Sequence, residues 1–323
     1  MHRILFGLSL AAVASIFLVA TGAEAPAADT VRVGKAQATS WTFVPLDLGV
    51  EEGIFAKYGI TIDEVDLAGD AKVQQALAAD SIDIGLGSGP GLAFVAKGAP
   101  SIGVAAFAGP PRNISLTVLE DSPIKSVADM KGKLVSVSTV GSLSDWLTTQ
   151  MSIAEGWGPH GIKTVALGPI ETSVAALKAH QLDAVNLATE AGFKLEEAHQ
   201  GRILIGMDKF APRFITHVVY ARRKFLADHP DQVDRFLKGF FASIAFLKAN
   251  KEKTSLAAQK IVRVSPAVAD RIYDYEVSML TDDGTFDPAA VTVLKQSFVE
   301  TGVLSAVPKD DALFTTQFVP VKP

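Results

Sequence analysis

The segment Ala-Leu-Ala-Ala-Asp-Ser-Ile-Asp at residues 76–83 has a counterpart 100 residues later, Ala-Leu-Lys-Ala-His-Gln-Leu-Asp at residues 176–183. Five of the eight positions are identical or exchange isoleucine for leucine. Both segments are typical of a helix end, a short turn and a strand that begins with aspartate. The match indicates an internal duplication, although two unrelated units of this kind could also resemble each other by chance.

Strand-like and helix-like segments alternate around each copy. In the first unit we expect strands at 31–36, 60–67, 82–86 and 102–108, with helices at 46–57, 72–79 and 91–97. In the second unit we expect strands at 133–138, 163–167, 184–187 and 202–206, with helices at 144–154, 172–179 and 191–198. This alternation is typical of βαβ units and a mainly parallel sheet. The sequence therefore predicts an α/β protein with two similar lobes.

Two further strand-like segments, 114–119 and 214–221, lie at the boundaries of the second unit. We expect the chain to cross between the lobes there. From residue 225 onward the pattern is helical, and this C-terminal helical block is expected to pack back on the first lobe. The predicted domains are residues 29–115 with 217–323 as lobe 1, and 116–216 as lobe 2.

Composition excludes several classes of protein. The 323 residues are 48% hydrophobic and 20% charged, which indicates a globular chain and not a disordered one. The net charge of −5 argues against a general nucleic-acid binder, since those proteins usually carry a basic excess. The chain has no cysteine, which excludes disulfides, thiol catalysis and thiolate-bound metals.

The first residues are typical of a secretory signal peptide. A short positive start, Met1-His2-Arg3, precedes the apolar run 4–20, and small residues follow at 21–25. We expect residues 1–23 to be removed. An uncleaved membrane anchor is the alternative, but the run is shorter than the ~20 residues that span a bilayer. Because no cysteine can accept a lipid, the sequence predicts a freely diffusing periplasmic protein and not a lipoprotein.

No catalytic pattern stands out. The glycine-rich segment 85–91 has Leu86 and Pro90 at positions where a dinucleotide-binding turn or a nucleophile elbow needs glycine. The six histidines are dispersed without metal-ligand spacing, and we expect them at the surface or at helix caps. We therefore predict a protein that is not an enzyme and that has no cofactor and no metal site.

Polar residues gather where predicted helices follow predicted strands, which is where open α/β sheets bind ligands. The candidate ligand contacts are Thr39, Ser40, Trp41, Ser88, Gly89, Thr139, Gly141, Ser142 and Glu190. Each has an ordinary structural alternative. Trp41 could be a core residue, Ser88-Gly89 a tight turn, Ser142 with Asp145 a capping box, and Glu190 an acidic helix start.

Two arginines next to prolines, Arg112 and Arg213, are candidates to neutralise an anion from the boundary segments, and Phe214 follows the second of them. Solvated surface arginine is the alternative interpretation. The helix N-termini near these segments would also favour an anion, because their amides carry a partial positive charge.

Four segments, at 48–62, 75–85, 127–133 and 225–238, resemble characteristic motifs of the nitrate/sulfonate/taurine-type periplasmic solute-binding proteins of ABC transporters. The segment Val-Ala-Asp-Met-Lys-Gly-Lys at 127–133, for example, is similar to that family's entry to its second lobe. The resemblance covers about residues 31–300. It implies a type II, Venus-flytrap fold, with two lobes joined by two crossing strands and a ligand held between them.

The resemblance also implies a function. A small organic or sulfonate-type anion would be captured by hinge closure about 114–119 and 214–221 and delivered to an ABC permease by a monomeric protein. Two departures make a simple sulfonate or nitrate less favoured than a larger organic ligand. Thr189 stands where family members often have tryptophan, and Asp145 lies close to the second-lobe helix start.

Two other functions stay open at this point. One is an enzyme on the same fold, of the kind that makes pyrimidine or menaquinone precursors. The other is a ligand-sensing partner of a membrane receptor. The sequence does not distinguish transport from sensing, and it does not identify the ligand.

Overall fold

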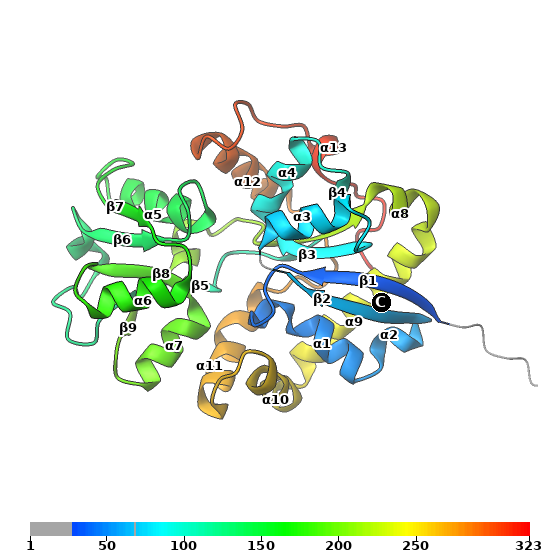
Figure 1. Cartoon of the computed structure of the whole chain (residues 1–323), viewed down its shortest axis with the longest axis horizontal. Helices are drawn as coiled ribbons and strands as arrows, with labels where there is room; N and C mark the ends of the chain where they lie inside the picture. Colours follow the sequence, from blue (N-terminus) through cyan, green and yellow to red (C-terminus); the bar gives the residue numbers. More distant parts are fainter. Residues whose placement is uncertain (1–27, 68) are drawn as a thin grey trace, which may run out of the picture.

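The computed structural model describes residues 28–67 and 69–323. The predicted signal peptide lies outside the described residues. The chain forms two five-stranded sheets, each covered by helices, which lie side by side in Figure 1. We call the sheet that contains the N-terminal strand and its helices lobe 1, and the other sheet with its helices lobe 2.

The lobe 1 sheet has the strand order β2-β1-β3-β10-β4. Strand β1 pairs in parallel with β2 and β3, whereas β10 is antiparallel to both of its neighbours. The strands are β1 (Asp29–Lys35), β2 (Ile60–Asp66), β3 (Ile84–Ser88), β4 (Ser101–Ala108) and β10 (His217–Arg222). Every residue of β4 is buried, as in a strand with both faces covered.

The lobe 2 sheet repeats this topology with the order β7-β6-β8-β5-β9. Strand β6 is parallel to β7 and β8, and β5 is antiparallel to β8 and β9. The strands are β5 (Ile114–Val118), β6 (Leu134–Val137), β7 (Lys163–Ala166), β8 (Ala184–Ala188) and β9 (Arg202–Gly206). In each lobe one strand is antiparallel to both of its neighbours, β10 in lobe 1 and β5 in lobe 2. Each of them is the first strand of its sheet after the chain has crossed from the other lobe. The predicted two-lobed α/β fold is confirmed.

Helices cover both sheets. Those of lobe 1 are η1 (Trp41–Phe43), α1 (Val44–Glu51), α2 (Ile54–Lys57), α3 (Asp70–Ala78), η2 (Gly89–Gly91) and α4 (Leu92–Ala96). Those of lobe 2 are η3 (Val127–Met130), α5 (Leu143–Ala154), α6 (Ile170–Lys178), α7 (Thr189–Glu197) and η4 (Met207–Phe210). Among the described helices, none combines the length and the apolar character that a membrane span requires.

The predicted duplication is visible at the level of single contacts. Helices α3 and α6, and strands β3 and β8, begin and end 100 residues apart. Asp83 accepts a hydrogen bond from the backbone N–H of Arg32 at 3.1 Å, and Asp183 accepts the equivalent bond from Leu134 at 2.9 Å. Each of the two aspartates thus ties the start of its own strand segment to the neighbouring strand.

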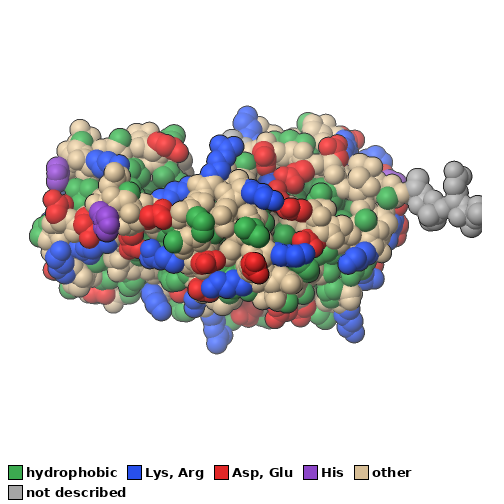
Figure 2. Space-filling view, turned by 90° about the horizontal axis from the view of Figure 1, so that it is seen from below, with side chains coloured by type: hydrophobic (Ala, Val, Ile, Leu, Met, Phe, Trp, Pro, Cys, Tyr) green, Lys and Arg blue, Asp and Glu red, His purple; other side chains and the backbone are tan. Residues whose placement is uncertain are grey.

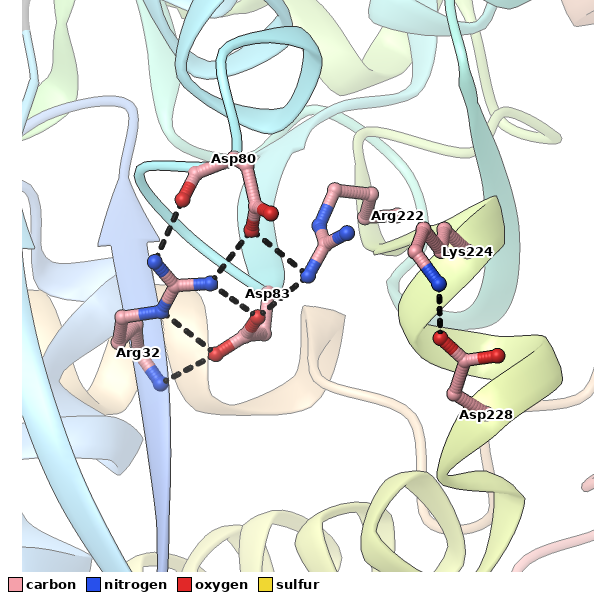
Figure 3. Close-up of polar contacts among 6 residues, drawn as sticks. All are labelled: Arg32, Asp80, Asp83, Arg222, Lys224 and Asp228. Carbon is pink, nitrogen blue, oxygen red and sulfur yellow. Dashed lines mark hydrogen bonds and ion pairs between the residues drawn. The ribbon is translucent and has the colours of Figure 1, made fainter.

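In lobe 1 the same aspartate also joins three parts of the sheet through ion pairs (Figure 3). Asp83 contacts Arg32 of β1 at 2.6 Å and Arg222 of β10 at 3.0 Å, and the more exposed Asp80 contacts both arginines. Burial raises the pKa of the Asp83 carboxyl, but its hydrogen bonds to the two arginines outweigh burial, so the pKa lies below its usual value.

The C-terminal helices are α8 (Arg223–Asp228), α9 (Pro230–Ala249), α10 (Lys251–Ile261), α11 (Pro266–Glu276), η5 (Val277–Met279), α12 (Pro288–Glu300) and α13 (Asp310–Leu313). Helix α9 packs on lobe 1, with Phe240 edge-on to Phe107 at 5.2 Å between ring centres. Two other helices reach lobe 2. Tyr275 of α11 meets Phe193 of α7, and Glu300 of α12 accepts a hydrogen bond from Trp146 of α5 at 2.8 Å. The block therefore packs on lobe 1, as the sequence predicted, and also contacts lobe 2.

The chain passes between the sheets at residues 109–113 and 207–216. The segments predicted as crossings, 114–119 and 214–221, are largely β5 and β10, the strands that follow each passage. We propose residues 29–115 with 217–323, and 116–216, as the two domains. Strand membership supports this division except at residues 114 and 115, which pair within the lobe 2 sheet.

Candidate functional site

A cavity of about 860 Å³ is lined by residues of both lobes. From lobe 1 it is reached by Ala36, Gly69 and Ser88, at the carboxyl ends of β1, β2 and β3. From lobe 2 it is reached by Ser138, Gly168 and Ala188, at the carboxyl ends of β6, β7 and β8. These are the ends at which open α/β sheets bind ligands, so the duplicated topology brings two such edges face to face.

Asp70 and Ser88 form one polar part of the lobe 1 wall. The Asp70 carboxylate, at the first residue of α3, accepts hydrogen bonds from the Ser88 backbone N–H at 2.7 Å and from Ser88 Oγ at 2.5 Å. Burial raises the pKa of the Asp70 carboxyl, and the two bonds from Ser88 oppose that shift. Two acceptor positions of the carboxylate are thereby used, out of about four.

His217, at the start of β10, forms part of the cavity lining between the lobes. Its Nδ1 lies 3.3 Å from the Gly87 carbonyl oxygen, and its Nε2 lies 3.1 Å from Thr42 Oγ1. Because a carbonyl only accepts, Nδ1 carries the proton and Nε2 is the acceptor. Burial lowers the pKa of His217 to about 4, so the ring is neutral near pH 7 and adds no charge to the cavity.

The lobe 2 wall contains Thr139, Gly141 and Ser142, in the loop that leads into α5. The Gly141 backbone N–H donates to the Asp145 carboxylate at 2.9 Å, and the Asp145 N–H donates to Ser142 Oγ at 3.4 Å. The sequence predicted a capping box in which Asp145 would accept from the Ser142 amide, and the structure gives Gly141 as the donor instead. The Gly141 N–H is therefore already bonded to the Asp145 carboxylate and is not free to bind a ligand.

Two asparagines of the cavity lining have a free acceptor. Asn186 donates through Nδ2 to the Ser144 carbonyl at 3.2 Å and to Thr148 Oγ1 at 2.6 Å, which fixes the orientation of its amide. Asn113 directs its Nδ2 at Nε2 of His217, at 3.3 Å. The Oδ1 atoms of both side chains are buried and have no hydrogen-bond partner among the described residues.

Five of the predicted ligand contacts line the cavity: Ser40, Ser88, Thr139, Gly141 and Ser142. Four others do not. Thr39 is exposed in a turn, and Gly89 packs so closely on Ile215 that a Cβ would lie 1.9 Å from its carbonyl oxygen. Trp41 is fully buried and stands edge-on to Tyr273 at 6.4 Å.

Glu190, the fourth, is buried at the start of α7 with Oε2 unpaired among the described residues. Burial raises the pKa of its carboxyl, and a hydrogen bond from the Trp41 backbone partly offsets this. Burial, together with the charge of Glu190, raises the pKa of Glu276 in α11 well above its usual value. Glu190 thus belongs to a buried contact between lobe 2 and the C-terminal helices.

The two predicted anion-binding arginines lie away from the cavity lining. Arg112 is 3.8 Å from Asp208 and donates to the Tyr275 carbonyl at 3.3 Å, and Arg213 is exposed. Phe214 is buried and stacks on Trp146 at 5.1 Å between ring centres, behind the cavity wall.

Sequence reasoning missed many polar residues of the lining, among them Asp70, Asn113, Asn186 and His217. Asp70 carried a usable signal, because Gly69-Asp70 follows a predicted strand and precedes a predicted helix. The two asparagines and the histidine lie in or beside strands, where only the paired sheets show which way a side chain points. In the described part of the chain, no group of three or more His, Cys, Asp or Glu side chains is placed to hold a metal ion.

A family model described as NMT1/THI5 like matches residues 41–254. The chain belongs to the NMT1/THI5-like family. One relative, from Bacillus subtilis (strain 168), is provisionally named an aliphatic sulfonates-binding protein and is 27% identical over 254 residues, 75% of this chain and 74% of its own length. Another, from Haemophilus influenzae, is provisionally named a thiamine biosynthesis protein and is 26% identical over 56% of this chain and 64% of its own length.

Solved structures of similar shape include the periplasmic aliphatic sulphonate binding protein SsuA from Escherichia coli, with a TM-score of 0.76. The match has 20% sequence identity and covers 90% of this chain and 92% of that chain. This similarity establishes the periplasmic-binding-protein fold for this member of the family. The predicted resemblance to sulfonate-type solute-binding proteins is confirmed.

Proposed function

We propose that this chain is the solute-binding component of an ABC importer. It captures a small molecule in the cavity between the lobes and delivers it to a permease in the membrane. One observation carries the proposal: the lining of the cavity comes from the carboxyl ends of strands in both lobes. A ligand that contacts both walls interacts more strongly with the closed arrangement than with an open one, so binding favours closure.

The proposal includes the setting in which the protein acts. We infer that residues 1–23 direct export and are then removed, and that the mature chain is a monomer in the periplasm without a lipid anchor. The Escherichia coli protein SsuA, a periplasmic binding protein with this fold, supports that inference. Figure 2 shows acidic and basic side chains intermixed over one face of the molecule, so a permease that docks on that face would meet charges of both signs.

For the contacts, we propose that Ser40, Ser88, Thr139, Gly141 and Ser142 touch the ligand. Trp41, Phe214 and Glu190 are proposed to support the walls from behind, and Thr39, Gly89, Arg112 and Arg213 to shape the surrounding turns. The name of the Bacillus subtilis relative supports the predicted organic or sulfonate-type anion. The charges in the cavity favour another class of ligand, which is argued in the next subsection.

A thermal-shift screen of the purified protein against sulfonates, nitrate, carboxylates, amines and heterocycles tests the binding role. A ligand at about 100 times its dissociation constant adds about 2.7 kcal/mol to the free energy of unfolding. We expect one class to raise the melting temperature clearly. No shift with any class would contradict a solute-binding role.

Deletion of the gene tests delivery. Loss of uptake of the stabilising solute is the expected result. Unchanged uptake together with loss of a cellular response to that solute would instead favour the sensing role.

An enzyme of precursor synthesis is a second candidate, favoured by the relative that is provisionally named a thiamine biosynthesis protein. Mass spectrometry of each stabilising compound after incubation with the protein separates the two functions. We expect the compound to be recovered unchanged, and a product of different mass would support the enzyme.

A further inference from the structure

The cavity lining carries few positive charges. Among the described residues that line it, the acidic side chains are Asp70 and Glu171, and Lys97 is the one lysine or arginine. Lys97 is exposed at the end of α4, and His217 is neutral near pH 7. A monovalent anion in this cavity would therefore depend on hydrogen-bond donors and not on a cation, because a buried anion must be paired with a cation or with several donors.

The helix starts at the cavity do not compensate for this deficit. An N-terminus attracts anions through its free amides and its dipole. Here three such starts carry a carboxylate of the chain itself in their first turn: Asp70 in α3, Asp145 in α5 and Glu171 in α6. Asp145 accepts the Gly141 N–H, and Asp70 accepts the Ser88 N–H. An anionic ligand would compete with Asp70 and Asp145 for these two donors.

The buried side-chain atoms of the lining that lack a partner among the described residues are also acceptors. Oδ1 of Asn113 and Oδ1 of Asn186 are buried without a partner in the described part of the chain, and the Asp70 carboxylate keeps about two of its acceptor positions. Buried acceptors without a donor are costly, so such atoms in a cavity wall indicate a missing donor group. A ligand rich in N–H groups supplies those donors, whereas a sulfonate supplies none.

We propose that the cavity selects a small organic amine, whose protonated nitrogen is held by Asp70 and whose carbon skeleton lies against Phe43 and Phe298. Further N–H or O–H groups of such a ligand would bond to Asn113 and Asn186. Both phenylalanines line the cavity and are themselves almost fully buried, so their surfaces are rigid apolar walls. This inference rests on the proposed solute-binding function and names the chemical class of its ligand.

Matched pairs of probes test the inference. Each pair shares a carbon skeleton and differs in charge: hexylamine with hexane-1-sulfonate, cyclohexylamine with cyclohexanesulfonate, and benzylamine with phenylmethanesulfonate. Dissociation constants are measured by ligand-observed NMR titration of the wild-type protein. We expect the amine of at least one pair to bind about tenfold or more tightly than its sulfonate, since a hydrogen bond to a charged group is worth that much.

Asp70→Asn keeps the size of the side chain and removes its charge, so we expect it to weaken amine binding by about tenfold. Asp63→Asn, at an exposed position of β2 in the same lobe, is the matched control and should bind amines like the wild type. The comparison of probe pairs needs no variant, so it decides the question even where Asp70→Asn does not fold.

Three results would overturn the inference: tighter binding of the sulfonates, equal amine binding by a folded Asp70→Asn variant, or no binding of any probe amine. Tight sulfonate binding with loss of uptake on gene deletion would overturn the ligand class and leave the importer role standing. Unchanged uptake on deletion would overturn the importer role whichever probe binds.

Discussion

His217 is a buried histidine between the rings of Phe43 and Phe107, at 5.0 and 5.4 Å. In the unfolded chain it binds a proton below pH 6.5, whereas in the folded chain its pKa is about 4. The unfolded state therefore holds more protons between these values, and the folded state loses stability as the pH falls from 6.5 to 4. We expect this residue to account for about 3 kcal/mol of that loss.

Denaturant unfolding at pH 7 and pH 4 measures this effect. His217→Gln should lose less stability over that range than the wild type, because it has no proton to gain. His160→Gln changes an exposed ring and should keep the wild-type dependence. Equal slopes for wild type and His217→Gln would show that this histidine is not the responsible group.

The carboxyl groups of Glu190 and Glu276 form a second titrating feature at the scale of single residues. Their exposed fractions are 6% and 0%, and both oxygens of Glu276 have no partner among the described residues. Burial first, and then the charge of Glu190, raise the pKa of Glu276. The folded state thus holds more protons than the unfolded state above the usual pKa of a glutamate, and stability falls as the pH rises.

Glu276→Gln removes the titrating proton and nearly keeps the shape of the side chain. We expect its melting temperature to exceed that of the wild type increasingly between pH 5 and pH 9, in scanning calorimetry. Glu155→Gln, at an exposed helix end, is the control and should follow the wild type. A constant difference across this pH range would contradict a raised pKa at Glu276.

At the scale of elements, the repeated aspartates make an internal comparison possible. The Asp83 side chain is 6% exposed and pairs with Arg32 and Arg222, whereas Asp183 is 36% exposed and, among the described residues, pairs with Lys133 alone. Removing one partner of a buried ion pair costs about 3–5 kcal/mol, and an exposed pair contributes about 0–1 kcal/mol. Asp83→Ala should therefore destabilise the protein by about 3 kcal/mol and Asp183→Ala by about 1 kcal/mol in denaturant unfolding. Equal losses would mean that the cluster in Figure 3 adds nothing beyond the shared backbone bond.

Much of the element order could be predicted, because each strand and helix carries its own local pattern. The predicted helix at 46–57 is instead two helices, since Gly53 adopts a left-handed φ of 63° between them. Asp80 and His180, which occupy equivalent positions of the two repeated segments, both have a positive φ. The similarity of these segments therefore extends from sequence to backbone conformation.

The site was harder to predict than the fold, because a position at a strand end does not tell which residues face the cavity. Ser88 and Ser142 were found, since Ser88 ends β3 and Ser142 caps the helix that follows β6. Trp41 and Glu190 lie at similar positions, yet they turn away from the cavity toward α11, a helix that begins only at Pro266. Only the packing of the C-terminal block decides that direction.

At the scale of the whole molecule, the account predicts that the two lobes approach each other when the cavity is filled. The absence of cysteine allows spin labels at chosen sites without background labelling. Lys72 of α3 and Thr172 of α6 are exposed, occupy equivalent positions of the repeat and follow the cavity-lining residues Ala71 and Glu171. Substitution of both by cysteine therefore places one label on each side of the cavity.

The most direct test of the account is the distance between these two labels, measured by pulsed electron paramagnetic resonance with and without the probe that raises the melting temperature most. We predict that the probe shifts the distance distribution to a shorter and narrower one. An unchanged distribution in the presence of the bound probe would contradict capture by closure of the two lobes.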